Sequence, residues 1–206
     1  MTTIIYLAHL NPVTNSHAEI IEELKNSYEN VIVMPVIFLK NNMEINSRSF
    51  PFNFKIRKEM LKSIFKNSIS ISSNYTFHAP YWRYLPPLIS PMSWVLKKKI
   101  LDGIGKNYLT YTGDKSEWYL LKVYGFNPKI GTRKAISATT VKEKIYNAAI
   151  GKKTNWTEYL PDEIICIINK NWNIIKEFAD KKDATIKITG MKFPKDGYWS
   201  KRIKEE

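Results

Sequence analysis

The sequence predicts an α/β fold: a Rossmann-like, doubly wound parallel sheet with C-terminal helices and a short C-terminal appendage. In the first hundred residues, short β-branched runs alternate with helical patterns, which is the sequence form of βαβ units. The length of 206 residues suits one domain. Hydrophobic residues make up 44% and charged residues 25%, as in ordinary globular proteins. We therefore predict a main domain over residues 1–182 and an appendage over residues 183–206.

The expected elements follow from hydrophobic periodicity and turn residues. The strand candidates are residues 3–8, 31–38, 68–73, 108–112, 129–132 and 185–193. The helix candidates are residues 16–27, 53–65, 94–104, 115–123, 139–149 and 161–180, with Pro161 in the first turn of the last. A capping box of Ser16 with Glu19 marks the first helix start. The polar segment 39–52 is expected to overhang a site, and the aromatic-rich and proline-rich segment 75–94 to be irregular.

The chain is strongly basic, with a formal net charge of +13. Such a charge raises the local concentration of polyanions, so nucleotides, phosphometabolites and nucleic acid are all candidate partners. The alternative is that the excess is spread over solvated helix faces, as in residues 97–99, which are all lysine. Charge alone therefore names no partner.

Cysteine usage and hydropathy exclude several classes. Cys166 is the single cysteine, which excludes a disulfide framework and a zinc cluster, and its isoleucine neighbours suggest a core position. The longest apolar run, residues 31–39, is too short to span a membrane and contains Pro35. No charged leader precedes the first apolar stretch, so we expect a cytoplasmic protein without membrane association.

A histidine stands in the first turn of a helix that begins just after the first strand. The segment is residues 8–17, with the sequence AHLNPVTNSH. Open α/β sheets bind ligands at the carboxyl ends of their strands. A helix N-terminus there offers unpaired amides and a partial positive charge, so a triphosphate can bind, with Thr14 and His17 as further donors.

This segment resembles the first signature of the HIGH-motif nucleotidyltransferase superfamily, Gly-x-Phe-x-Pro-x-(His or Thr)-x-Gly-His. Pro12, Thr14 and His17 match it. The residues at positions 8, 10 and 16, which are Ala, Leu and Ser, replace Gly, Phe and Gly. Ser16 therefore puts a side chain where the family has close approach to adenine.

The second signature of that superfamily, Ile-Ser-x-Thr-x-x-(Arg or Lys), resembles residues 136–142, with the sequence ISATTVK. Hydroxyls and amides at a helix start, with a cation one turn further on, suit the β- and γ-phosphates of ATP. The alternative is a structural N-cap, since Thr140 and Glu143 also form a capping box. Two signatures in the right order favour the nucleotidyltransferase interpretation.

Shorter stretches resemble two branches of the superfamily. Residues 51–53 with Arg57, residues 93–95 and residues 112–114 are similar to segments of nicotinamide mononucleotide (NMN) adenylyltransferases. Thr14 followed by Asn15, and Lys142 in place of Arg, are similar to pantetheine-phosphate adenylyltransferases. Superfamily membership is therefore better supported than any one substrate.

The resemblance implies a set of site residues. The catalytic group would be Thr14 and His17 on the α- and β-phosphates and Lys142 on the leaving pyrophosphate. The further ATP-binding residues would be Ala8, His9, Leu10, Gly113, Asp114, Ser137 and Thr139. The acceptor-binding residues would be Arg57, Trp82 and Trp94, with a Trp stacking on a flat ring. Mg²⁺ would be held mainly through the phosphates of the substrate, without protein ligands of its own.

Several of these residues have an ordinary structural alternative. Asp114 equally suits a turn before a helix, and His9 equally suits a buried histidine. Core packing is the better expectation for Trp82 and Trp94, and solvated surface charge is the commoner fate of a residue such as Arg57.

The resemblance thus implies an enzyme that moves AMP from ATP to a small phosphomonoester and releases pyrophosphate, with NMN as the expected acceptor and NAD as the product. A pantetheine-phosphate adenylyltransferase or a cytidylyltransferase is the alternative within the same class. A catalytically weakened protein that binds nucleotides or nucleic acid is the alternative outside it, because of Ser16 and the positive charge. We expect ATP and a phosphorylated acceptor as partners and do not expect nucleic acid; a homo-oligomer stays open.

Overall fold

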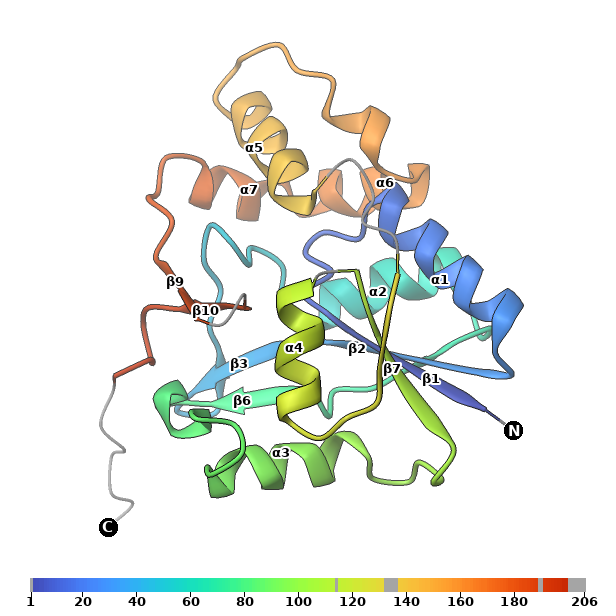
Figure 1. The fold of residues 1–206 in the computed structure, drawn as a ribbon. Coiled ribbons are helices and arrows are strands. Elements are labelled where there is room, and N and C mark those ends of the chain that lie inside the picture. The colour runs from blue at the N-terminus through green and yellow to red at the C-terminus, as the bar shows by residue number, and fades with distance from the viewer. Residues whose placement is uncertain (1, 114, 132–136, 189–190, 200–206) are drawn as a thin grey trace.

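The computed structural model describes residues 2–113, 115–131, 137–188 and 191–199, the side chain of residue 116 excepted. Its centre is a five-stranded parallel sheet in the order β5-β2-β1-β7-β8 (Figure 1). The strands are β1 (Thr3–Ala8), β2 (Asn30–Pro35), β5 (Ser70–Ile71), β7 (Tyr108–Thr112) and β8 (Pro128–Ile130). The predicted α/β fold with a parallel sheet is confirmed.

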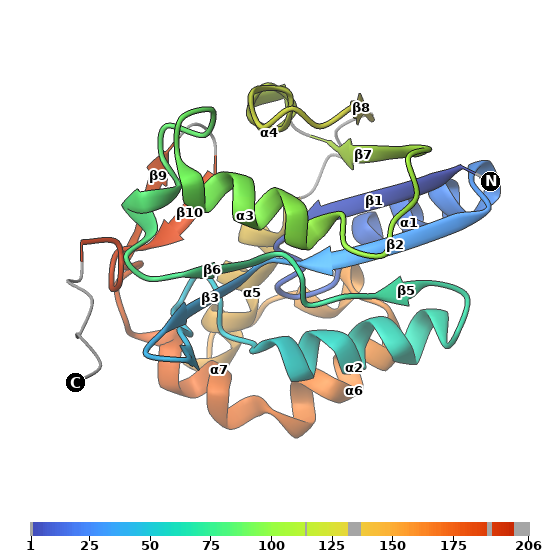
Figure 2. The same ribbon diagram turned by 90° about the horizontal axis from the view of Figure 1, so that it is seen from below.

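The central strand β1 is buried on both faces and divides the core into two layers. Ile4 and Tyr6 point into one hydrophobic cluster, and Ile5 and Leu7 into the other, as the alternation of a strand requires. The first cluster holds α1 (Asn15–Ser27), α2 (Phe54–Phe65), α5 (Ala138–Ala149), α6 (Asp162–Lys170) and α7 (Trp172–Ala179). The second holds α3 (Pro91–Ile100) and α4 (Lys115–Val123), on the opposite side of the sheet (Figure 2).

Two smaller sheets extend the second layer. The predicted strand 31–38 is divided, because Pro35 ends the ladder of β2 and the chain re-pairs as β3 (Ile37–Lys40). There β3 pairs with β4 (Met43–Glu44) and β6 (Thr76–His78) in a separate sheet. The predicted edge strand 185–193 is an antiparallel hairpin of β9 (Thr185–Ile188) and β10 (Met191–Pro194).

The hairpin is firmly packed. Met191, Phe193 and Tyr198 are buried in the second cluster, and the Phe193 ring contacts those of Phe38 and Phe77 at centroid distances of 5.5 and 5.4 Å. Residues 191–198 therefore belong to the same hydrophobic core as the end of the main sheet. From the sequence we expect the basic tail after residue 193 to be loose; this is wrong as far as Tyr198, which is buried.

The structure corrects the predicted helix 161–180. Pro161 lies at the N-cap, and the helix is interrupted at Asn171, which divides α6 from α7. The Asn171 amide donates to the Ile167 carbonyl at 2.8 Å, so a polar side chain competes with the backbone there. Cys166 is exposed on α6, because Ile164 and Ile167 take the buried face.

The helix caps also differ from the prediction. Thr14 is the N-cap of α1, ahead of Ser16, and Ser137 caps α5, ahead of Thr140. In segment 75–94, predicted to be irregular, β6 and a 3₁₀ helix (η1, Tyr81–Tyr84) are regular, and α3 begins at Pro91. A second 3₁₀ helix, η2 (Trp156–Tyr159), precedes α6. No helix in the described ranges has the length and apolar character needed to cross a membrane.

Arg57 of α2 fastens the ends of the central strands together. It is 2% exposed, and one terminal nitrogen donates to the carbonyls of His9 and Val36, each at 2.8 Å. Its other terminal nitrogen pairs with Glu44 Oε1 at 2.8 Å, and Glu44 Oε2 accepts from the first amide of α2, that of Phe54. Arg57 was predicted to bind the acceptor; this is wrong, because its terminal nitrogens are used inside the protein.

The Arg57→Met variant is expected to lose about 3–5 kcal/mol of unfolding free energy, because it leaves Glu44 and two strand carbonyls without their donor. Arg57→Lys is also expected to lower the unfolding free energy, since a single ammonium cannot donate to all the acceptors that the two terminal nitrogens of the guanidinium reach. Urea denaturation measures both. Lys55→Met changes an exposed residue of the same helix and is the control; its urea midpoint should equal that of the wild type. A wild-type midpoint for Arg57→Met would contradict the role of Arg57 in holding the strand ends.

Candidate functional site

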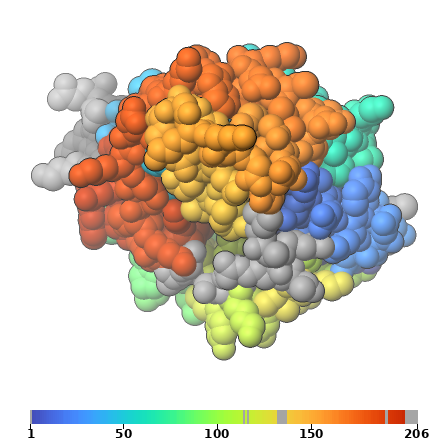
Figure 3. Space-filling model, turned by 90° about the horizontal axis from the view of Figure 1, so that it is seen from above, coloured from blue at the N-terminus to red at the C-terminus, as the bar shows by residue number. Residues whose placement is uncertain are grey.

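A cleft of about 300 Å³ opens at the carboxyl ends of β1 and β7, between the N-termini of α1 and α5. Figure 3 looks onto this end of the molecule, where α1 (blue), α4 (lime), α5 (yellow to orange) and the C-terminal segment (red) come together. The predicted site residues that line the cleft are Ala8, His9, Leu10, Thr14, His17, Gly113, Ser137, Thr139 and Lys142. The two segments that resemble the signatures, remote in sequence, therefore line one cleft.

His17 is oriented by the cap of α1. Its Nδ1 accepts the backbone N–H of Thr14 at 3.1 Å and lies 3.0 Å from the Thr14 hydroxyl. Because Nδ1 is an acceptor, the proton of the neutral ring is on Nε2. Burial, and then the charge of Lys142, lowers the pKa of His17 to about 4. At neutral pH the residue is therefore an uncharged hydrogen-bond donor.

His9 follows the last residue of β1 and stacks on Phe50, with ring centroids 4.8 Å apart. Burial, followed by the charges of Lys142 and Arg57, lowers the pKa of His9 to about 3. Its buried Nδ1 has no hydrogen-bond partner in the part of the chain that the structure describes. His9 is therefore a neutral polar group at the cleft with hydrogen-bonding capacity to spare.

The start of α5 supplies the opposite wall. Ser137 Oγ accepts the backbone N–H of Thr140 at 3.2 Å, so the serine caps the helix, and Ala138 and Thr139 follow on its first turn. First-turn amides have no partner within a helix and attract anions. The N-termini of α1 and α5 thus present partial positive charge to the same space.

Lys142 lies one turn into α5 and is 8% exposed. Its ammonium donates to the Ser49 carbonyl at 2.5 Å and lies 5.9 Å from the centre of the Phe50 ring. Burial, and next the charge of Lys192, lowers the pKa of Lys142 to about 7. Ser49 and Phe50 belong to segment 39–52, and Phe50 lines the cleft, which agrees with the expectation that this segment reaches over the site.

Several lining residues were not found by sequence reasoning, among them Asn11, Glu117 and Lys192. Asn11 exchanges two hydrogen bonds with the backbone of Phe52, at 2.7 and 3.2 Å, and so ties the first signature to segment 39–52. Glu117 accepts from the Thr112 hydroxyl at 2.6 Å and places a carboxylate at the cleft. Lys192 comes from β10. Asn11 could have been found from its place in the first motif, directly after the strand, and Glu117 from its place in the first turn of the helix that follows Thr112. No sequence pattern pointed to Lys192.

The predicted acceptor residues lie elsewhere. Trp82 and Trp94 are absent from the lining and belong to η1 and α3, and Arg57 is the buried clamp. The alternative expectation for both tryptophans, packing in the core, is also wrong, since their exposed fractions are 46% and 48%. Asp114, predicted to bind the ribose, lies outside the described residues.

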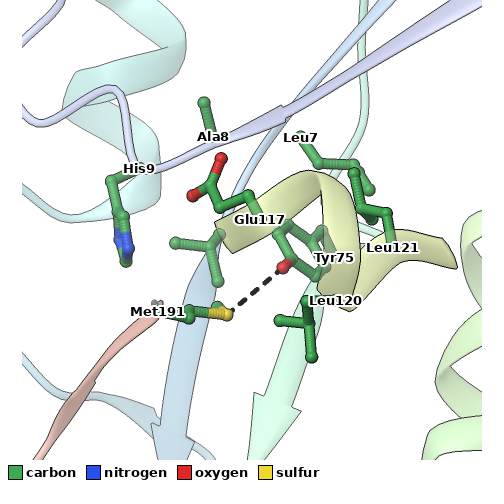
Figure 4. A pocket seen from close by; sticks show the side chains of 9 residues that line it. Leu7, Ala8, His9, Tyr75, Glu117, Leu120, Leu121 and Met191 are labelled. Atoms are coloured by element: carbon green, nitrogen blue, oxygen red, sulfur yellow. Dashed lines mark hydrogen bonds between the residues drawn. The ribbon is translucent and has the colours of Figure 1, made fainter. Parts of the chain in front are cut away.

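A narrow apolar pocket of about 20 Å³ adjoins the cleft beside Ala8, His9 and Glu117 (Figure 4). Leucines of β1 and α4 surround it, and the Tyr75 hydroxyl donates to the Met191 sulfur at 3.4 Å. This volume holds about one water-sized probe. An aromatic ring could enter only if these side chains moved.

Solved structures with a similar fold include proteins described as adenylyltransferases. A bifunctional NMN adenylyltransferase/ADP ribose pyrophosphatase from Francisella tularensis superposes with a TM-score of 0.63 at 15% identity, over 86% of this chain and 52% of that one. The same protein complexed with AMP and a manganese ion gives 0.59 at 14% identity, over 86% and 52%. A Vibrio parahaemolyticus protein assigned as a nicotinate-nucleotide adenylyltransferase gives 0.52 at 15% identity, over 86% and 97%.

This chain therefore spans about half the length of the Francisella protein. No family model matches the sequence, and no curated protein matches it. At these identities the comparisons show a shared fold, a parallel sheet with flanking helices.

Proposed function

We propose that this protein is an adenylyltransferase that moves AMP from ATP to the phosphate of NMN, forming NAD and pyrophosphate. One observation carries the proposal: the segments that resemble the two superfamily signatures, well over a hundred residues apart, line a single cleft. Two helix N-termini and the ammonium of Lys142 face it, which suits a polyanion such as a triphosphate. Descriptions of the structural neighbours agree with this chemistry.

The reaction needs no covalent enzyme intermediate. An oxygen of the acceptor phosphate attacks the α-phosphorus of ATP, the bond from that phosphorus to the oxygen bridging to the β-phosphate breaks, and pyrophosphate leaves with that oxygen. The proposed contribution of the protein is to hold the reactants in line and to stabilise charge on the phosphates.

Each wall of the cleft has a part in this scheme. We assign the Nε2–H of His17, with Thr14 and the start of α1, to the α- and β-phosphates. Ser137, Thr139 and Lys142 would bind the departing pyrophosphate through hydroxyls, first-turn amides and charge. The backbone of Gly113 would lie against the adenosine ribose, and Asp114 remains a proposed ribose ligand.

The donor set of the cleft fits a divalent ion that arrives with the nucleotide. Glu117 is the one carboxylate among the described lining residues, and it already accepts from Thr112. Phosphate oxygens would therefore supply most ligands of a Mg²⁺ ion. When bound, Mg²⁺ neutralises phosphate charge.

The identity of the acceptor is a separate and more specific part of the proposal. It is supported by the similarity of residues 51–53 and 112–114 to NMN adenylyltransferases and by the descriptions of the neighbours. With Trp82 and Trp94 away from the cleft, a pyridine ring would have to contact other groups, such as the rings of His9 and Phe50. Pyrophosphate release with ATP, Mg²⁺ and either NMN, nicotinate mononucleotide or phosphopantetheine tests the choice. NAD formed from NMN supports the proposal; release with phosphopantetheine alone would replace the acceptor.

His17→Ala is expected to lower the rate of pyrophosphate release by roughly 10²–10³-fold, the usual effect of removing one preorganised donor to a charged transition state. The matched control is His78→Ala on β6, because His78 is exposed and outside the cleft. A near-normal rate for His17→Ala, with the control unchanged, would show that His17 has another role.

Lys142 predicts a pH dependence of ATP binding. Its pKa of about 7 in the free protein means that the ammonium is lost as pH rises through neutrality, whereas bound phosphates favour the charged form. ATP affinity, measured by calorimetry, should therefore fall between about pH 7 and 9 in the wild type. His9 and His17, with pKa values of about 3 and 4, stay neutral over this range and contribute nothing to the change.

Lys142→Arg is the control, because arginine keeps its charge throughout this range and should flatten the profile while retaining ATP binding. Lys142→Ala should bind ATP weakly at every pH. Identical pH profiles for the wild type and Lys142→Arg would argue that Lys142 does not contact the nucleotide.

A further inference from the structure

The C-terminal hairpin brings a second lysine to the cleft. Lys192 of β10 lines it, 35% exposed, with its ammonium 3.3 Å from Ser49 Oγ and 3.1 Å from Asp183 Oδ2. The carbonyl of the same Ser49 accepts from Lys142 at 2.5 Å. Two ammonium groups from distant parts of the sequence therefore meet at one residue beside the start of α5.

Two ammonium groups that both contact one residue repel each other unless an anion offsets their charge. Lys142 forms no ion pair in the described part of the chain, and the charge of Lys192 is one cause of its lowered pKa, after burial. Two carboxylates act on Lys142: Asp183, which is 41% exposed, pairs with Lys192 and accepts from Thr185 at 3.1 Å, and Glu143, which pairs with Arg48 at 2.6 Å. Neither Asp183 nor Glu143 lines the cleft, so a phosphate bound there would add negative charge beside the two lysines.

We propose that Lys192 binds the β- and γ-phosphates of the nucleoside triphosphate together with Lys142, so that the C-terminal hairpin is a wall of the active site. This rests on the proposed function of the cleft. In the free protein Asp183 holds the Lys192 ammonium. On binding, the ammonium exchanges the carboxylate for phosphate oxygens, which carry more charge and lie between the two lysines.

The test is calorimetry with ATP, inorganic pyrophosphate and AMP, each with Mg²⁺. Lys192→Ala should weaken ATP and pyrophosphate binding about tenfold or more, the scale of one charged hydrogen bond, and leave AMP binding unchanged. Lys192→Arg should restore most of the affinity. Lys195→Ala removes an exposed lysine just after β10 and should change nothing, which controls for overall charge.

Asp183→Asn separates this role from simple anchoring of the hairpin. If Lys192 binds phosphate, loss of its competing carboxylate should keep or raise ATP affinity. If Lys192 only anchors the hairpin through Asp183, both variants should lose ATP affinity and melting temperature together, and the proposal is wrong.

Failure of the inference is distinct from failure of the proposed function. Unchanged ATP and pyrophosphate binding in Lys192→Ala, with loss in Lys142→Ala, would overturn the role of Lys192 and leave the adenylyltransferase standing. Absence of ATP and pyrophosphate binding by the wild type would overturn both.

Discussion

The geometry of the cleft depends on the buried guanidinium of Arg57. It holds the carbonyl of His9, where β1 ends, and that of Val36, just after β2. The first signature leaves the sheet at that point, so the position of α1 and its cap follows from this clamp. Glu44 both neutralises Arg57 and accepts the first amide of α2, so one ion pair joins strand ends, a small sheet and a helix. A buried charge is tolerated here because both terminal nitrogens of the guanidinium have acceptors and one of them pairs with a carboxylate.

Burial also decides the charge state of the cleft. Both histidines are neutral at physiological pH because their surroundings disfavour the imidazolium, and Lys142 is close to its titration midpoint. The site therefore combines uncharged donors and helix N-termini with Lys142, whose protonation a bound anion would favour. Such a site gains positive charge on binding a phosphate, which links affinity to pH.

Much of the fold followed from the sequence, because β-branched runs and helical periodicity report which faces are buried. The strand of residues 108–112 and the helix of residues 115–123 have the predicted bounds. Segment 31–38 was predicted as one strand because hydropathy does not show where the hydrogen bonds between two strands end. In the structure they end at Pro35. For the site, the two motifs predicted residues that do line one cleft. Arg57 was misassigned because no sequence pattern marks Glu44, the residue with which it forms a buried ion pair. Lys192 was missed for the same kind of reason: tertiary packing of the hairpin, invisible in the local sequence, brings it to the cleft.

The proposed function requires one triphosphate to lie between the N-termini of α1 and α5. A crystal structure with Mg²⁺ and an ATP analogue that has a methylene group between its α- and β-phosphorus would locate it. We expect the α-phosphate within hydrogen-bond distance of His17 Nε2 and the terminal phosphates at Ser137, Thr139 and Lys142. A triphosphate bound elsewhere, or pointing away from both helix N-termini, would contradict it.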